Sequence, residues 1–187
     1  ILTHGDRDHI GGVLNFPKAR FVLCQKMFEA WTTPTKQEGM IEEFAKLFRG
    51  SLEDEALKAR VQPRRAFASE VLPQIKERLQ PTVFEEEFLP GFKLIDATGH
   101  RSDHTALEIS SGGETLIHVV DSFRHPLQIN YDLPSFIDSY PEELVASNKR
   151  LIKCSLETKA LLFGAHLAFP GLARVSQGSA GLEWKWV

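Results

Sequence analysis

The first nine residues concentrate side chains that can bind metal ions. The stretch "ILTHGDRDHIGG" places His4, Asp6, Asp8 and His9 within six residues, directly after an apolar start. Neutral imidazole and carboxylate groups are preferred ligands of zinc and related divalent ions. Because alternate residues of an extended segment point to the same side, His4 and Asp6 are placed to bind one ion, and Asp8 and His9 to bind another. Each residue alone would be interpreted as a turn residue or a helix cap, so the prediction depends on the cluster.

Three more polar residues each follow an apolar run that is typical of a strand. They are His100 after "KLIDATG", Asp121 after "TLIHVV" and His166 after "ALLFGA". The ends of strands are where α/β proteins usually place their binding residues. The sequence therefore predicts one site that combines the first cluster with three distant strand ends.

Hydrophobic periodicity predicts an α/β protein in three regions. Residues 1–24 are expected to hold a strand end, a loop, a helix start and a strand, and residues 25–80 to be mostly helical. Later residues are expected to form a meander of short strands, a helix from Pro141, and two last strands. The expected strands cover 82–88, 92–97, 104–110, 115–121, 160–166 and 182–187.

The helical region has apolar residues at helical spacing. Met40, Leu47 and Phe48 fall on one helix face, and Ser51 is expected to cap the next segment. A further helix is expected to carry Val71, Leu72, Ile75 and Leu79 until Pro81 stops it. The Phe-rich stretch from Phe28 to Phe84 is expected to be core, or alternatively a lid over a pocket.

Composition limits the classes of protein and of partner. With 187 residues, 42% of them hydrophobic and 25% charged, the sequence suits one globular domain over residues 1–187. A net charge of -3 without a basic run argues against nucleic acid as a partner. The longest apolar runs fall short of the roughly 20 residues that cross a bilayer, so no membrane partner is expected. Cys24 and Cys154 lie far apart without CxxC spacing, which favours a reducing compartment such as the cytoplasm.

The ordered motifs resemble those of the metallo-β-lactamase superfamily, whose signature H-x-H-x-D-H is followed by a distant His, Asp and His. "THGDRDHIGG" resembles the first block, "ATGHRSDHTA" the block with a Gly-His ligand, "HVVDSF" the strand that ends in a bridging Asp, and "GAHLAFPG" the final block. The resemblance implies an αββα sandwich with a two-metal site along its edge. It implies His4, Asp6 and His100 as ligands of one ion, Asp8, His9 and His166 as ligands of the other, and Asp121 as the bridge.

The resemblance also implies an activity. A hydroxide held by two divalent ions, zinc first and manganese or iron next, would attack an ester, a lactone or a phosphotriester. Asp8, as a proton carrier, and Asp121 are the expected catalytic residues, while Arg124 and His125 are expected to orient the small-molecule substrate. The end of the chain and "DSFRHPLQ" look most similar to the lactonase and methyl-parathion-hydrolase-like branch.

Two features depart from the superfamily pattern. Asp6 stands where the superfamily has a histidine, which adds a carboxylate to the ligand set and favours harder metals such as manganese or iron. Exchange of Asp6 for histidine is therefore expected to keep both ions and to shift the preference towards zinc. Only Ile1 and Leu2 precede the first motif, so we expect part of the N-terminal sheet to be missing. Upstream residues or a second copy are expected to cover the apolar sheet face that this leaves.

Two alternatives stay open at this point. A diiron redox enzyme of the same superfamily is favoured by the carboxylate of Asp6. A non-catalytic metal-binding or scaffold protein would result if the altered ligand set bound no metal. Of the other histidines, His104 and His118 are expected to pack or to form hydrogen bonds.

Overall fold

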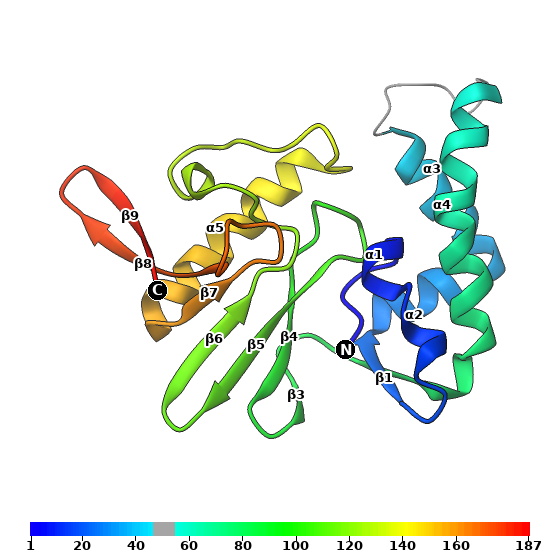
Figure 1. The fold of residues 1–187 in the computed structure, drawn as a ribbon, viewed down its shortest axis with the longest axis horizontal. Coiled ribbons are helices and arrows are strands. Elements are labelled where there is room, and N and C mark those ends of the chain that lie inside the picture. The colour runs from blue at the N-terminus through cyan, green and yellow to red at the C-terminus, as the bar shows by residue number, and fades with distance from the viewer. Residues whose placement is uncertain (47–54) are drawn as a thin grey trace. The chain divides into compact units, whose positions relative to one another are not determined.

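The computed structural model describes residues 1–46 and 55–187, and its elements are drawn in Figure 1. The chain divides into two compact units. Ile1–Val83 and Arg101–His104 form what we call the N-terminal unit, and Phe84–His100 and Thr105–Val187 form the C-terminal unit. The single domain expected over residues 1–187 stays a prediction, since compact units can belong to one domain.

The N-terminal unit is a small parallel sheet with helices. Strand β1 (Phe21–Cys24) pairs in parallel with β2 (Leu79–Thr82). The helices are α1 (Arg7–Ile10), α2 (Gln25–Thr32), α3 (Pro34–Lys46) and α4 (Glu55–Gln74), with 3-10 helices at Val13–Asn15 and Lys76–Arg78. Helices α3 and α4 lie side by side (Figure 1). The mostly helical region expected over residues 25–80 is confirmed for the described residues.

The expected boundary of the last helix in this region is wrong. Helix α4 ends at Gln74, and Leu79 begins β2. Pro81 lies inside that strand, where it pairs with Leu23 and does not stop a helix. A proline fits there because β2 is an edge strand of a two-stranded sheet, where one missing N–H is tolerated. Met40 is buried as expected, while Leu47, Phe48 and Ser51 lie outside the described residues.

The C-terminal unit is built on a mixed sheet of seven strands in the order β3-β4-β5-β6-β7-β8-β9. The bounds are β3 Glu87–Leu89, β4 Phe92–Asp96, β5 Thr105–Ser111, β6 Glu114–His118, β7 Leu161–Phe163, β8 Leu172–Gly178 and β9 Gly181–Trp186. The antiparallel meander from β3 to β6 is confirmed, and β6 pairs in parallel with β7. A 3-10 helix (Pro126–Ile129) and α5 (Pro141–Thr158) connect these two strands.

Two strand predictions differ from the structure. The strand expected over residues 82–88 is interrupted, because Glu85 has a positive φ of 65° and lies in a turn before β3. Strand β8 was not expected, since "LARVSQG" carries polar residues and a glycine that weaken its alternation. The helix from Pro141 is confirmed, with the proline in the first turn, where its missing N–H costs nothing.

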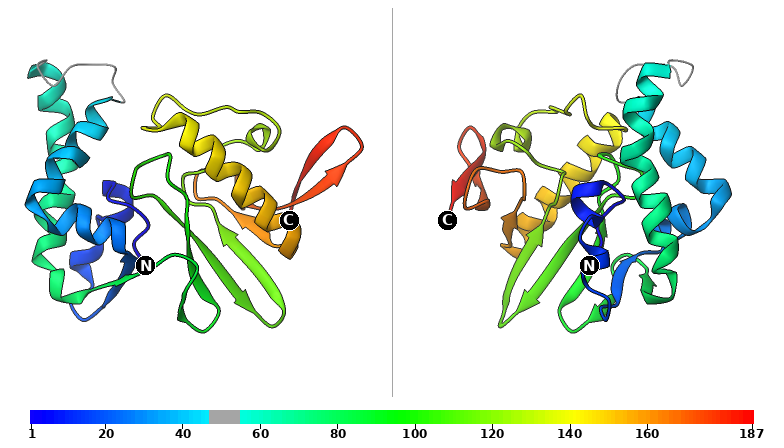
Figure 2. Two further views of the ribbon diagram at one scale, coloured as in Figure 1. Left: turned by 180° about the vertical axis from the view of Figure 1, so that it is seen from behind. Right: turned by 45° about the vertical axis from the view of Figure 1, so that its right-hand side comes forward.

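The core of the C-terminal unit lies between the sheet and α5, which crosses one sheet face (Figure 2). Side chains of this face pack with Leu151 and Ile152 of α5; they include Ile95, Ala106, Ile117, Leu162 and Val175. The opposite face is also apolar. Its partly exposed members are Phe92, Ile109, Leu116, Leu161 and Phe163, while Leu94 and Leu107 are buried. The partner expected to cover this face stays a prediction.

Within residues 1–46 and 55–187, no helix combines the length and the apolar character needed to cross a membrane.

Gly99 provides a test of the packing that positions the neighbouring His100. Its φ is +147°, and an added Cβ would overlap backbone atoms of Leu144 in α5. We expect Gly99→Ala to lower the free energy of unfolding by roughly 2–4 kcal/mol, through backbone strain and overpacking. Urea denaturation would measure this loss. Gly39→Ala, in open space on α3, should instead stabilise the protein by about 0.5–1 kcal/mol. An unchanged midpoint for Gly99→Ala would contradict the expected contact.

Candidate metal centre

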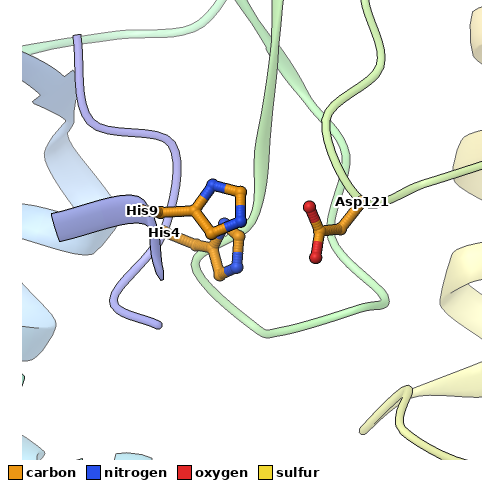
Figure 3. Close-up of side chains that lie close together, drawn as sticks. All are labelled: His4, His9 and Asp121. Carbon is orange, nitrogen blue, oxygen red and sulfur yellow. The ribbon is translucent and has the colours of Figure 1, made fainter. Parts of the chain in front are cut away.

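His4 and His9 lie next to each other in the N-terminal unit. Their ring centroids are 4.0 Å apart, and Figure 3 shows the two imidazoles side by side. The hydroxyl oxygen of Thr3 lies 3.3 Å from Nδ1 of both rings. One hydroxyl oxygen has lone pairs for two donors, so Thr3 can accept a hydrogen bond from the Nδ1–H of each ring. This tautomer leaves the lone pair of each ring on Nε2, as in a histidine that binds a metal through Nε2.

The side chain of Asp6 lies on the same side as that of His4, as the alternation predicts. Its Oδ2 atom is 3.7 Å from Nε2 of His4. Helix α1 begins at Arg7, so Asp6 occupies the N-cap position. Its carboxylate nevertheless turns to Arg101, whose Nη2 and Nε atoms lie 2.7 Å and 3.1 Å from Oδ2 and Oδ1. Arg101 is only 3% exposed, and no motif of the sequence points to it.

Asp8 differs from Asp6 in its exposure. It lies in the first turn of α1 with a side chain that is 66% exposed, and its Oδ2 is 3.5 Å from Nε2 of His9. An acidic residue near a helix N-terminus is electrostatically favourable. An exposed carboxylate beside an imidazole is suited to exchange protons with solvent.

A buried carboxylate, Asp103, holds the backbone between His4 and Asp6. Its Oδ2 accepts hydrogen bonds from the backbone N–H of Gly5 at 3.1 Å and from the indole N–H of Trp31 at 2.7 Å. A Cβ on Gly5 would overlap the Trp31 indole, so this position requires glycine. Asp103 and Trp31 are 1% and 0% exposed, which makes the contact a fixed support for the first motif.

The helices of the insertion hold the segment Arg101–His104 from a second side. Glu43 of α3, 2% exposed, accepts a hydrogen bond from the backbone N–H of Ser102 at 2.7 Å and another from its hydroxyl. Helices α2 and α3 thus contact this segment through Trp31 and Glu43. The insertion was expected to be core or a lid, and the structure adds a positioning role. His104 packs as expected, fully buried with its ring centroid 5.0 Å from that of His4.

His100, in the C-terminal unit, is oriented by Asp138. Its Nδ1 lies 2.9 Å from Oδ1 of Asp138, and its Nε2 lies 3.3 Å from Oδ2 of Asp121. Burial by itself would raise the pKa of Asp138. The hydrogen bond from His100, the charge of Arg124 and the N–H of Ser135 outweigh it and hold that pKa below its usual value. Asp138 lies in the loop "LPSFIDSYP" without a recognisable motif, so the sequence alone does not point to it.

Arg124 forms ion pairs with the carboxylates of Asp138 and Asp121. Its Nη1 is 3.0 Å from Asp138 Oδ1, and its Nη2 is 3.7 Å from Asp121 Oδ2 and 2.8 Å from Nδ1 of His100. We assign the Nδ1 proton of His100 to the bond with Asp138, because an ionised carboxylate is the stronger acceptor. His125 is exposed, and its Nδ1 accepts the backbone N–H of Leu127 at the start of the 3-10 helix. The substrate roles of Arg124 and His125 stay predictions.

Asp121 follows β6 on the loop drawn in Figure 3. The preceding Val120 has a positive φ of 52° while 1% exposed, a strained conformation for a β-branched residue that typically marks a functional turn. The Oδ2 atom of Asp121 lies 3.4 Å from Nε2 of His166, which is 42% exposed. One carboxylate oxygen is thus close to the imidazoles of both His100 and His166. His118 packs on Phe163 with ring centroids 4.6 Å apart, as expected.

The donor atoms fit a divalent metal. In the N-terminal unit the candidate ligands are His4, Asp6, Asp8 and His9, and in the C-terminal unit they are His100, Asp121 and His166. Imidazole nitrogen with carboxylate oxygen suits zinc, and also manganese and iron.

Comparison with solved structures identifies the fold. The lactonase AidC, described as a dizinc quorum-quenching enzyme in complex with a product, is 28% identical with a TM-score of 0.76, over 98% of this chain and 62% of AidC. The hydrolase AbOPH of the β-lactamase superfamily is 21% identical with a TM-score of 0.76, over 100% of this chain and 62% of AbOPH. A probable metal-dependent hydrolase from Staphylococcus aureus is 18% identical with a TM-score of 0.70, over 99% of this chain and 60% of that hydrolase.

The chain has the metallo-β-lactamase fold, as the sequence predicts, and its motifs follow one another in the order that is typical of that superfamily. It spans about three fifths of the length of these solved structures. No protein-family model and no curated protein matches the sequence.

The contact between Trp31 and Asp103 predicts the effect of removing one donor. Trp31→Phe keeps most of the apolar volume but deletes the indole N–H that donates to the buried carboxylate. We expect a loss of about 1.5–3 kcal/mol in the free energy of unfolding, the usual range for a hydrogen bond to a charged group. Guanidinium denaturation would measure it. Trp186→Phe, at a position that is 40% exposed, serves as control and should change stability by less than about 0.5 kcal/mol. Equal losses for the two variants would contradict the assignment.

The contact between His100 and Asp138 predicts the effect of releasing one imidazole. Asp138→Asn removes the carboxylate that accepts from Nδ1 of His100, so the imidazole can adopt its other tautomer. We expect zinc binding to weaken about 10- to 100-fold. Competition with a chelating dye would measure the affinity. Asp132→Asn, at an exposed carboxylate paired with Lys149, is the matched control and should leave the affinity unchanged. Tight zinc binding by Asp138→Asn would rule out the orienting role.

Proposed function

We propose that the protein is a metal-dependent hydrolase whose seven candidate ligands bind two divalent ions, zinc first and manganese or iron next. The proposed ligands are His4, Asp6 and His100 for one ion, Asp8, His9 and His166 for the other, and Asp121 between them. The observation that carries the proposal is that His4, His9 and His100 each have an oxygen partner at Nδ1. Such partners are typical of histidines that bind metals through Nε2.

Bound metal ions would supply a hydroxide near neutral pH and polarise the oxygen of the bond under attack. The residues of the chain then have separate tasks. Asp121 holds its carboxylate beside two imidazoles, while the exposed Asp8 exchanges a proton with solvent. Asp138 keeps His100 in one orientation, and Arg124 neutralises part of the charge of Asp138 and Asp121.

The proposed substrate is a small ester, lactone or phosphotriester with an apolar portion. Two exposed aromatic side chains near the candidate site residues in sequence favour a substrate with an apolar portion. Phe136 is 82% exposed and lies two residues before Asp138, and Phe169 is 98% exposed and lies three residues after His166. Among the three classes we favour a lactone. AidC is described as a lactonase with the product N-hexanoyl-L-homoserine, and this chain is more similar in sequence to AidC than to AbOPH.

The environment of Asp6 weakens the case for a diiron redox enzyme. That alternative depended on the carboxylate of Asp6 alone, and this carboxylate is paired with the guanidinium of Arg101, which offsets its charge. A reducing compartment such as the cytoplasm is also proposed, since Cys24 and Cys154 form no disulfide in the part of the chain that the structure describes.

Hydrolysis assays with and without zinc test the proposal. Aryl esters, lactones and phosphotriesters should be turned over by the zinc-loaded protein and not after chelation. Asp121→Ala should reduce kcat/KM by about 1000-fold, which is the usual loss when a group that stabilises the transition state electrostatically is removed. The loss is large because the Asp121 carboxylate lies beside the imidazoles of both His100 and His166. His125→Ala should reduce kcat/KM less. Asp132→Ala, at an exposed position, is the control for the loss of a carboxylate. Absence of turnover while both metal ions are bound would contradict the proposal that the protein is a hydrolase.

A further inference from the structure

The environment of position 6 carries a further inference. Asp6 places an anion where the superfamily motif has a neutral imidazole. Both of its oxygens meet one guanidinium, that of Arg101, at 2.7 Å and 3.1 Å. A two-point contact of this kind fixes the plane of the carboxylate as well as its position.

The charge balance of the pair is as informative as its geometry. The Asp6 side chain is 14% exposed and that of Arg101 only 3% exposed. A guanidinium stays protonated in proteins, so Arg101 brings one positive charge into a nearly buried place. Together the two side chains are neutral, which is also the charge of a neutral histidine at position 6.

The pair leaves Asp6 able to bind a metal ion. Carboxylates that bind metal ions commonly accept hydrogen bonds from a neighbouring side chain at the same time. The Oδ2 atom that accepts from Arg101 lies 3.7 Å from Nε2 of His4. Asp6 can therefore accept from Arg101 and still act with His4 as a ligand.

We infer that Arg101 is a positioning residue that immobilises Asp6 and offsets its charge, so that the pair replaces the histidine of the superfamily motif. The metal-binding half of this inference rests on the proposed function. Its consequence is that positions 6 and 101 are coupled. The sequence alone predicts that Asp6→His keeps both ions and prefers zinc, but the guanidinium beside position 6 changes this expectation. Histidine at position 6 suits the site only when the charge at position 101 is removed as well.

A cycle of four proteins tests the coupling: the wild-type chain, Asp6→His, Arg101→Gln, and the double variant. The unfolding midpoint of the metal-free proteins and their zinc affinity are measured, and cobalt absorption reports the ligand set. Asp6→His leaves a nearly buried guanidinium beside an imidazole, and Arg101→Gln leaves a carboxylate without its cation. We expect each single variant to unfold at lower urea and to bind zinc at least about tenfold more weakly. The double variant should recover both properties.

Two further variants separate positioning from general damage. Arg101→Lys keeps the charge but loses the planar fork, so it should restore the midpoint only in part and alter the cobalt spectrum. Lys149→Gln removes a cation from an exposed pair with Asp132, 3.0 Å apart, and should leave all readouts unchanged.

Two results would overturn the inference. One is a double variant whose losses equal the sum of the two single losses. The other is an Asp6→His variant with wild-type midpoint and zinc affinity. A wild-type chain that binds no zinc would overturn the proposed function and the ligand role of Asp6. In that event the metal-free midpoints would still decide whether Arg101 positions Asp6.

Discussion

The support of the first motif by Asp103 is the interaction on which the rest of the N-terminal unit depends. The carboxylate is almost fully buried, and it accepts from the Gly5 backbone and the Trp31 indole. A buried anion is tolerated only with such donors, so the loop, the glycine and the tryptophan constrain one another. His4 and Asp6 flank the tethered glycine. Their placement therefore depends on a residue nearly 100 positions later in the chain.

The two units use the same physical device for their histidines. The hydroxyl of Thr3 forms hydrogen bonds with the Nδ1 atoms of His4 and His9, while the carboxylate of Asp138 forms one with Nδ1 of His100. Each partner holds its imidazole in one orientation before a metal ion binds, which lowers the reorganisation that binding would otherwise require. The charges are balanced in a similar way: Arg101 meets Asp6 in one unit, and Arg124 meets Asp138 and Asp121 in the other.

Much of this arrangement was predictable from the sequence, and the reasons are specific. The ligand types and their order were visible because they cluster in "HGDRDH" or follow apolar strands. The meander and α5 followed from period-two and helical patterns. Arg101, Asp103 and Asp138 were not found as supports, because their roles depend on contacts between segments distant in sequence. Helix α4 was extended too far because Leu79 continues the helical spacing, although it pairs with Phe21 in a strand.

The distribution of tryptophans has an experimental consequence. The sequence holds three of them: Trp31 is completely buried in the N-terminal unit, and Trp184 and Trp186 lie on β9 in the C-terminal unit. The indole of Trp31 donates to a carboxylate, whereas the rings of Trp184 and Trp186 contact each other edge-on at a centroid distance of 5.4 Å. Their fluorescence should therefore differ in wavelength and in sensitivity to quenchers. With Trp31 replaced, the remaining emission reports on the C-terminal unit, and with both Trp184 and Trp186 replaced it reports on the N-terminal unit, without an attached dye.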